Sequence, residues 1–170
     1  MSELKLKTQR LNLRSTRQED LDDVAAIWGD KEGGKYMPDP YYKSGDEIAE
    51  ILDDTPECPV YYFVAFRIGF DEVMGTCSLG FENADTNEYS IGYNVKNEYW
   101  GNGYAVEMVQ ALIDFARKLG IEYITAPVAK ENKASNRVME KCGFFINGEG
   151  SFTKSGEDIV HQTFIYKLHL

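Results

Sequence analysis

The sequence predicts a single α/β domain whose sheet mixes antiparallel and parallel strands. Its 170 residues, 43% hydrophobic and 13% aromatic, are enough for a substantial core and too apolar for a disordered chain. Two apolar segments, Val60–Arg67 and Glu72–Phe81, are separated by a short turn with a glycine, which is typical of a hairpin. A long amphipathic helix then lies between two strand-like segments, and such a crossover usually joins parallel strands.

The N-terminal third predicts one strand, two helices and an aromatic loop. Leucines alternate with polar residues over Arg10–Ser15, which indicates a strand. Capping boxes at Thr16–Glu19 and Ser44–Glu47 predict the starts of two helices, the second ending before Pro56. The loop between these helices, Gly29–Lys43, is rich in tyrosine, glycine and proline.

The rest of the chain alternates strands and helices. Glu88–Val95 predicts a strand, and Gly103–Leu119 a helix with Gly120 as its C′ residue. The apolar face of this helix comprises Ala105, Met108, Val109, Leu112, Ile113, Ala116 and Leu119. The segments that follow are a strand at Tyr123–Val128, a helix at Lys133–Cys142 ending at Gly143, and strands at Phe144–Gly150 and Ile159–Leu168.

Charge and cysteine content restrict the partners. The net charge of −10 argues against nucleic acid or an anionic membrane; it suits a cationic ligand such as an amine, or serves only solubility. We expect no membrane association, because no apolar run reaches membrane-spanning length. The N-terminus lacks the apolar core of a signal peptide, and three widely spaced cysteines form no CxxC, so we expect a cytoplasmic protein.

The run from Asn97 to Ala105 is the most informative part of the chain. Gly101 and Gly103 form a bare turn between a strand and a helix N-terminus, where backbone N–H groups can converge on a diphosphate. The turn is not a Walker loop, since no Gly-Lys-Ser/Thr follows, nor a Rossmann fingerprint, since the third glycine is missing. Glycine turns also occur at helix starts for purely steric reasons.

Two segments, about thirty residues apart, carry a family resemblance. Trp100–Ala105 follows Ile-Gly-Tyr-Asn-Val at 91–95, and Asn-Lys-Ala-Ser at 132–135 leads into Glu-Lys-Cys-Gly-Phe at 140–144. In this order the chain resembles the GNAT (Gcn5-related) N-acetyltransferases, and within them the RimJ/RimL branch that acetylates ribosomal-protein N-termini. The resemblance covers nearly the whole chain. It implies one domain over residues 1–170, with a mostly antiparallel sheet of six to seven strands, a splayed parallel pair and about four helices.

The resemblance also implies a site for acetyl-CoA and no metal. The family motif Gln/Arg-x-x-Gly-x-Gly/Ala falls on Trp100, Gly103 and Ala105, so its first position departs from the pattern. The main chain of Gly101, Asn102, Gly103, Tyr104 and Ala105 would hold the diphosphate. The pantetheine arm would pair like an extra strand with Asn94 and Val95.

Residues at the start of the short helix would lie beside the thioester. Asn132 corresponds to a family asparagine near the pantetheine or thiol, although helix capping alone explains an Asn here. Ser135 corresponds to a serine beside the sulfur, or is an ordinary surface serine. Many family members carry a general-acid tyrosine one turn later, where this chain has Met139. Ser135 therefore becomes the catalytic candidate.

The general base is less clearly indicated. The RimL-like pattern has Glu directly before Ile-Gly-Tyr, and this chain has Ser90 there. Glu88 lies two residues earlier on the same strand face and becomes the candidate base. Glu82 and Asp85, in the preceding turn, are alternatives. Each could instead be a solvated carboxylate.

Several other residues are candidates for lesser roles. Lys130, Lys133, Arg137 and Lys141 surround the short helix and could reach the ribose 3′-phosphate of CoA, or be merely hydrated. His161 and His169 have no metal-ligand spacing and are expected to be structural. The aromatic loop over Tyr36–Tyr42 either packs on the core or forms a lid that selects the acceptor.

The expected reaction is direct attack of an amine on the thioester, with the oxyanion held by a backbone N–H near Val95. The favoured acceptor is a peptide or protein α-amine. A small-molecule amine, such as a polyamine, amino acid or aminoglycoside, is the alternative. Two further alternatives are a non-catalytic acyl-CoA sensor and a dimeric interaction domain; a homodimer is left open for the enzyme as well.

Overall fold

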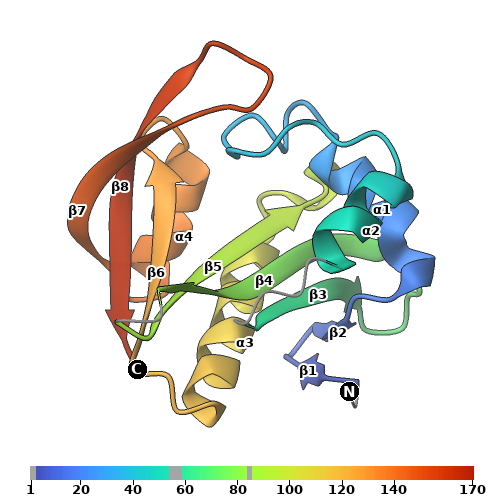
Figure 1. Ribbon diagram of the computed structural model, residues 1–170. Helices are drawn as coiled ribbons and strands as arrows, with labels where there is room; N and C mark the ends of the chain where they lie inside the picture. The colour runs from blue at the N-terminus through green and yellow to red at the C-terminus, as the bar shows by residue number, and fades with distance from the viewer. Residues whose placement is uncertain (1–2, 54–58, 84–85) are drawn as a thin grey trace.

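One mixed sheet runs through the computed structural model, which describes residues 3–53, 59–83 and 86–170 (Figure 1). Within these residues eight strands are ordered β1-β2-β3-β4-β5-β6-β8-β7. The strands are β1 (Lys5–Lys7), β2 (Leu11–Ser15), β3 (Val60–Arg67), β4 (Val73–Asn83), β5 (Glu88–Val95), β6 (Tyr123–Ala129), β7 (Phe145–Thr153) and β8 (Val160–His169). The α-helices are α1 (Leu21–Trp28), α2 (Gly45–Asp53), α3 (Tyr104–Lys118) and α4 (Lys133–Lys141).

The parallel pair of β5 and β6 is short and then splays. All other neighbouring strands are antiparallel, and among them β3 and β4 form the hairpin that the sequence predicted. Strands β5 and β6 pair only at Tyr89 with Ile124 and at Ser90 with Thr125, and beyond these residues they diverge. The predicted mixed sheet with a splayed parallel pair is therefore confirmed. Strand β1, which the sequence pattern did not indicate, is the eighth strand.

Helices cover both faces of the sheet. Helix α3 packs on one face and buries an apolar stripe from Met108 to Ala116 against β2 to β6. Helices α1 and α2 lie on the other face over a smaller cluster that includes Val64 and Val73 (Figure 1). In the part of the chain that the structure describes, no helix is both long and apolar enough to cross a membrane.

Helix α3 ends as predicted, with one correction to its apolar face. Gly120 has φ +74°, the N–H of Gly120 donates to Arg117 and that of Ile121 to Ala116, which is a Schellman ending. Leu119, expected on the buried face, is 43% exposed. It is the C-cap residue, and the chain has already begun to turn away from the sheet there.

Neither predicted capping box forms as expected. The N–H of Thr16 donates to Tyr62 of β3, so a 3₁₀ helix at Gln18–Asp20 starts one residue later. There Asp20, not Glu19, accepts the N–H of Arg17 at 2.8 Å.

In the second box the Glu47 carboxylate accepts the N–H of Lys43 at 2.9 Å. The sequence pattern had predicted the N–H of Ser44 as the donor. The expected stop before Pro56 lies outside the described residues, as do Cys58 and Asp85.

A buried ion pair fastens the start of α1 to β2. Arg14 donates two hydrogen bonds to the Asp20 carboxylate, at 2.6 and 2.8 Å, and the Asp20 side chain is only 5% exposed. Burial by itself would raise the pKa of Asp20, but the hydrogen bonds from Arg14 and Arg17 outweigh it and lower that pKa. The pair therefore stabilises the fold only while Asp20 is ionised.

We expect Asp20→Asn to lower the free energy of unfolding by about 3–5 kcal/mol at pH 7, because Arg14 is left buried without its anion. The wild-type advantage is present above the unfolded pKa of about 3.9 and disappears as the pH falls through the lower folded value. Urea unfolding across this range measures both effects. The control is Asp114→Asn, at an exposed pair with Arg117, which should change little. A pH-independent difference would contradict the prediction.

Candidate active site

A bare glycine turn precedes α3 at the open end of β5. Gly101 has φ +76° and Gly103 φ +79°, both in the left-handed region that glycine adopts without strain. Gly103 is the N-cap residue, and no side chain caps the helix there. The first N–H groups of α3 are thus presented without a side-chain cap, at the positive end of the helix. This is the arrangement that binds phosphate groups.

Arg10 and Glu107 brace this turn, and sequence analysis missed both. The Glu107 carboxylate accepts the backbone N–H of Arg10 at 2.7 Å and its Nε at 2.8 Å. The Arg10 guanidinium also donates to the Asn102 carbonyl at 3.0 Å and lies over the Tyr104 ring. The Asn102 side chain donates back to the carbonyl of Tyr99. No local motif reveals these contacts, because the partners are about a hundred residues apart.

The open edge of β5 is formed by Tyr93 and Val95. The N–H of Lys96 donates to Met74 of β4, so Val95, one residue earlier, directs its main-chain groups away from β4. Its carbonyl accepts the Trp100 Nε1 at 2.7 Å. Asn94 directs its main chain toward β4 and its buried side chain toward Met37. The register therefore favours Tyr93 and Val95, rather than the expected Asn94, as main-chain partners of a pantetheine arm.

Ser135 meets a tyrosine that the sequence did not single out. Its hydroxyl lies 2.6 Å from the hydroxyl of Tyr93 on β5. Burial raises the pKa of Tyr93 to about 12, and the hydrogen bond between Tyr93 and Ser135 opposes the shift, so the phenol is protonated at neutral pH. The N–H of Ser135 donates to Asn132 Oδ1 at 3.1 Å. Asn132 therefore caps α4, which is the structural role weighed for it.

Among the described residues, no hydrogen bond or ion pair joins Ser135 to the carboxylates proposed as bases. Ser90, which occupies the position of the branch's glutamate, donates its hydroxyl to the Glu82 carboxylate. Glu88 lies at the first position of β5 and accepts a long 3.4 Å hydrogen bond from Thr86. Through Ser90, Glu82 is linked to the strand position where the family pattern has its acid. Asp85, the third alternative, is outside the described residues.

Of the four basic residues around α4, Lys130 and Lys133 already have polar partners within the protein. Lys130 forms an ion pair with Glu149 at 2.7 Å, and Lys133 donates to the Lys130 carbonyl. Arg137 and Lys141 are exposed, and no ion pair to either is found among the described residues. They remain the candidates for contact with the 3′-phosphate.

The aromatic loop between α1 and α2 is held to the β7–β8 hairpin. Lys154, at the hairpin tip, is 1% exposed and donates to the carbonyls of Met37 and Asp39 at 3.0 and 2.6 Å. Tyr36 makes an edge contact with His161, which is buried on β8. His161 also lies 3.7 Å from Glu131, so it has a partner that its sequence context did not reveal.

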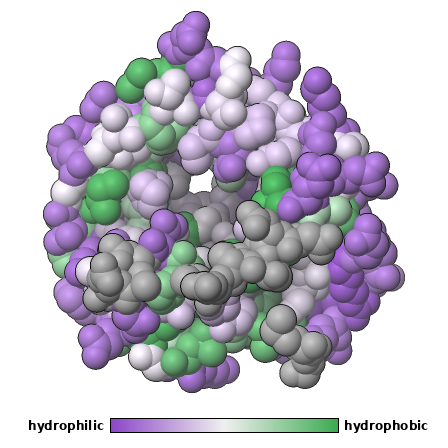
Figure 2. Space-filling model, viewed as in Figure 1, coloured by the Kyte–Doolittle hydropathy of each residue, from purple (hydrophilic) through white to green (hydrophobic). Residues whose placement is uncertain are grey.

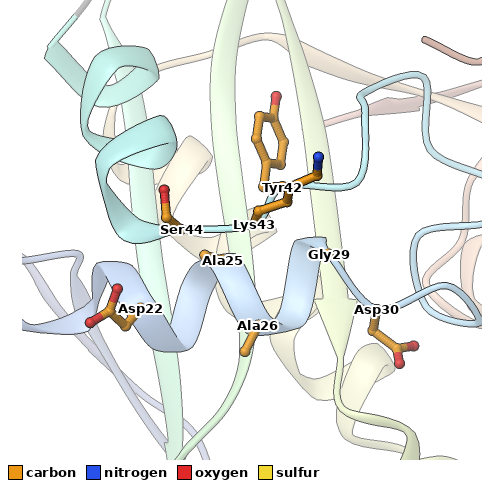
Figure 3. A pocket seen from close by; sticks show the side chains of 8 residues that line it. All are labelled: Asp22, Ala25, Ala26, Gly29, Asp30, Tyr42, Lys43 and Ser44. Atoms are coloured by element: carbon orange, nitrogen blue, oxygen red, sulfur yellow. The ribbon is translucent and has the colours of Figure 1, made fainter. Parts of the chain in front are cut away.

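A separate shallow pocket of about 320 Å³ lies along the outer side of α1 (Figure 3). It is lined by Asp22, Ala25, Ala26, Gly29, Asp30, Tyr42, Lys43 and Ser44. None of the site residues expected from the sequence lines it. Asp22 is engaged with the N–H of Gly45, and Asp30 with that of Gly33, so both carboxylates serve the local loop structure.

The site offers neither a metal cluster nor an activated thiol in the residues described. No group of three or more His, Cys, Asp or Glu there is arranged to hold a metal ion. Cys142 is half-buried near the start of α3, and burial raises the pKa of its thiol to about 11. Burial also raises the pKa of Cys77. Such thiols are rarely ionised at neutral pH and are poor nucleophiles.

Known proteins share both the sequence pattern and the fold. Residues 10–145 match the family model of the acetyltransferase (GNAT) domain. An L-methionine sulfoximine/L-methionine sulfone acetyltransferase of Pseudomonas aeruginosa is 35% identical over 145 residues, covering 81% of this chain and 82% of the relative.

Two solved structures from Vibrio cholerae share the fold at lower identity. A spermidine N-acetyltransferase in complex with CoA and spermine superimposes with a TM-score of 0.83, 20% identity, and 95% and 96% of the two chains covered. A putative ribosomal-protein-serine acetyltransferase gives a TM-score of 0.77 and 21% identity, with 98% of each chain covered. The family match spans the glycine turn, the splayed strands and α4. The chain therefore belongs to the GNAT acetyltransferase family, and it is an N-acetyltransferase.

Proposed function

We propose that this protein transfers the acetyl group of acetyl-CoA to an α-amine, or to another weakly basic primary amine, by direct attack. The observation that carries the proposal is the splay of β5 from β6, with the bare glycine turn of α3 at the open end of β5. A diphosphate on that turn would leave the pantetheine arm to run along the free edge of Tyr93 and Val95. The thioester would then reach Ser135.

The chemistry needs no covalent enzyme intermediate. The amine lone pair forms the new C–N bond at the thioester carbonyl, and the negative charge on the carbonyl oxygen is met by the Val95 N–H. The C–S bond breaks, the thiolate leaves, and the amine loses one proton to solvent or a base. We assign to Ser135 the role of protonating or hydrogen-bonding the sulfur, with Tyr93 orienting its hydroxyl. The raised pKa of Cys142 agrees with direct transfer.

The acceptor class is inferred from position 90, where this chain has a serine in place of the glutamate of the RimL-like pattern. Ser90 donates its hydroxyl to the Glu82 carboxylate. The resemblance to the RimJ/RimL branch favours a protein N-terminus as the acceptor, and the L-methionine sulfoximine/L-methionine sulfone acetyltransferase favours an amino-acid derivative. The spermidine enzyme, at 20% identity, supports the small-amine alternative. We place the reaction in the cytoplasm; a homodimer remains an expectation for size-exclusion measurements.

The diphosphate site is tested by a matched pair, Gly103→Asp and Gly103→Asn. Asn and Asp tolerate the left-handed conformation better than other side chains, and a Cβ at Gly103 meets only Arg10, at 3.6 Å. Only Asp adds a charge beside the diphosphate. We expect the Kd of the Asp variant for CoA to exceed that of the Asn variant at least tenfold. We give only this modest minimum, because Arg10 would neutralise part of the added charge. Calorimetric titration measures this, and equal affinities would remove the assignment.

Ser135 is tested together with Tyr93. The thiol of CoA has a pKa of about 8.5, so it leaves largely unaided at pH 7.5. Ser135→Ala and Tyr93→Phe should each lower kcat by about ten- to a hundredfold, at or below the range for general acid–base catalysis, with little change in KM for acetyl-CoA. The double variant should be no slower than the slower single variant, because the hydroxyls act as a unit. Additive losses would argue against the pair, and unchanged rates would exclude both residues.

The acceptor preference is tested with one peptide offered in two forms. A lysine amine, pKa about 10.4, is only about 0.1% neutral at pH 7.5, whereas an α-amine of pKa about 7.7–8.0 is roughly a quarter to two-fifths neutral. We expect a much higher kcat/KM when the N-terminus is free and the lysine blocked than in the reverse form. Thiol release measures both. Faster turnover of the lysine form would contradict the inference and redirect attention to Glu82 and Glu88.

A further inference from the structure

A closed circuit of contacts surrounds the region where β5 and β6 diverge. Strand β5 pairs with β6, β6 with β8, and β8 with β7. From the tip of the β7–β8 hairpin, Lys154 and Ser155 bond the aromatic loop, with the N–H of Ser155 donating to Pro38 at 2.9 Å. The loop returns to β5, because Met37 Sδ lies 3.4 Å from Asn94 Nδ2.

The figures show the space that this circuit surrounds. In Figure 1 the hairpin tip reaches over to the loop between α1 and α2, above the divergence of β5 and β6. Figure 2, in the same view, shows an opening near the middle of the molecule at this position. The circuit is therefore not filled by side chains, and an elongated group can enter it.

Lys154 joins the β7–β8 hairpin to the aromatic loop and, unlike most lysines, is not exposed at the surface. It follows the last residue of β7, its side chain is fully buried, and its ammonium lies 4.1 Å from the centre of the Tyr41 ring. A buried ammonium must be hydrogen-bonded, and here its acceptors are two carbonyls of the loop. Strand β7 would need no such residue for its own pairing. The strong partners of Lys154 therefore all belong to the loop.

We propose that Lys154 closes this circuit of contacts around the entrance for the acceptor amine. Lys154 is thereby a residue that determines the specificity for the acceptor amine. This inference rests on the proposed function. Ser135 lies on the α4 side of β5, whereas Asn94 faces the loop on the opposite side, so an amine attacking the thioester from the free side passes the loop. The closed circuit admits an amine at the end of a slender molecule, such as an amino-acid amide or the end of an unstructured peptide. It excludes an amine close to a folded surface.

The test compares Lys154→Met with wild type and with the control Lys167→Met. Lys167 also lies over a tyrosine ring, that of Tyr123, but near the other end of β8 and away from the loop. Hydrogen exchange over residues 34–43 reports the link independently of activity. Acetylation is measured with alanine amide and with a folded protein whose free N-terminal alanine lies close to its surface. Calorimetry with CoA checks the cofactor site.

In Lys154→Met we expect exchange in the loop to rise at least tenfold and the KM for alanine amide to increase. The kcat/KM ratio of folded protein to amide should rise at least tenfold, with CoA affinity unchanged; Lys167→Met should match wild type. Tyr41→Leu, which removes the ring under the ammonium, should shift exchange and the ratio in the same direction if Lys154→Met does not fold.

Faster exchange with an unchanged acceptor ratio would overturn the role in specificity, and unchanged exchange would overturn the link itself. If the wild-type protein acetylates neither amine, but hydrogen exchange over residues 34–43 is still faster in Lys154→Met, the proposed function is wrong. The contact between Lys154 and the loop is then still supported.

Discussion

The short pairing of β5 with β6 is the constraint on which the rest of the site depends. Only two residue pairs join these strands, and every later residue of β5 loses its neighbour on that side. Unpaired main-chain groups of a strand are costly inside a protein and invite an extended partner. In this chain they lie between the glycine turn of α3, where we propose that the diphosphate binds, and the hydroxyl of Ser135. The splay thus creates a free strand edge between the two parts of the proposed site.

Polar contacts between distant segments hold the divergent strands in place. Asn136, buried on α4, donates to the carbonyls of Ala129 and Asn132 and accepts from Tyr166 at 2.8 Å. These bonds fasten α4 to the end of β6 and to Tyr166 within β8, and thereby set the position of Ser135. On the other side Arg10 and Glu107 fasten the glycine turn to the start of β2. Both networks are satisfied internally, so they hold the geometry without a ligand.

Local electrostatics differ from the overall charge. The chain carries a net charge of −10, which is unfavourable for an anionic cofactor at long range. The glycine turn counters this with the positive end of α3, whereas the charge of Arg10 is already paired with Glu107; Arg137 and Lys141 lie exposed on α4. The acidic excess is then available to favour a cationic or weakly basic amine. The enzyme's main contribution would be to position the two substrates.

The sequence by itself determined those features that depend on neighbours in the chain. Periodicity and glycine punctuation predicted seven of the eight strands, the four helices, the parallel crossover and the glycine turn; β1, only three residues long, carries too little pattern to be recognised. The capping boxes were misplaced because backbone pairing of Thr16 with β3 competes with local capping. Asn132 and Ser135 were found through a family pattern.

Only the tertiary structure decided which distant groups meet. The Tyr93 hydroxyl on Ser135, the Arg10 brace and the Lys154 link join residues between 42 and 117 positions apart, and no local spacing encodes such pairs. The choice of Val95 over Asn94 as an open-edge residue depends on which side of β5 pairs with β4. A strand's own alternation assigns its side chains to faces, but the neighbouring strand decides which main-chain groups are left free.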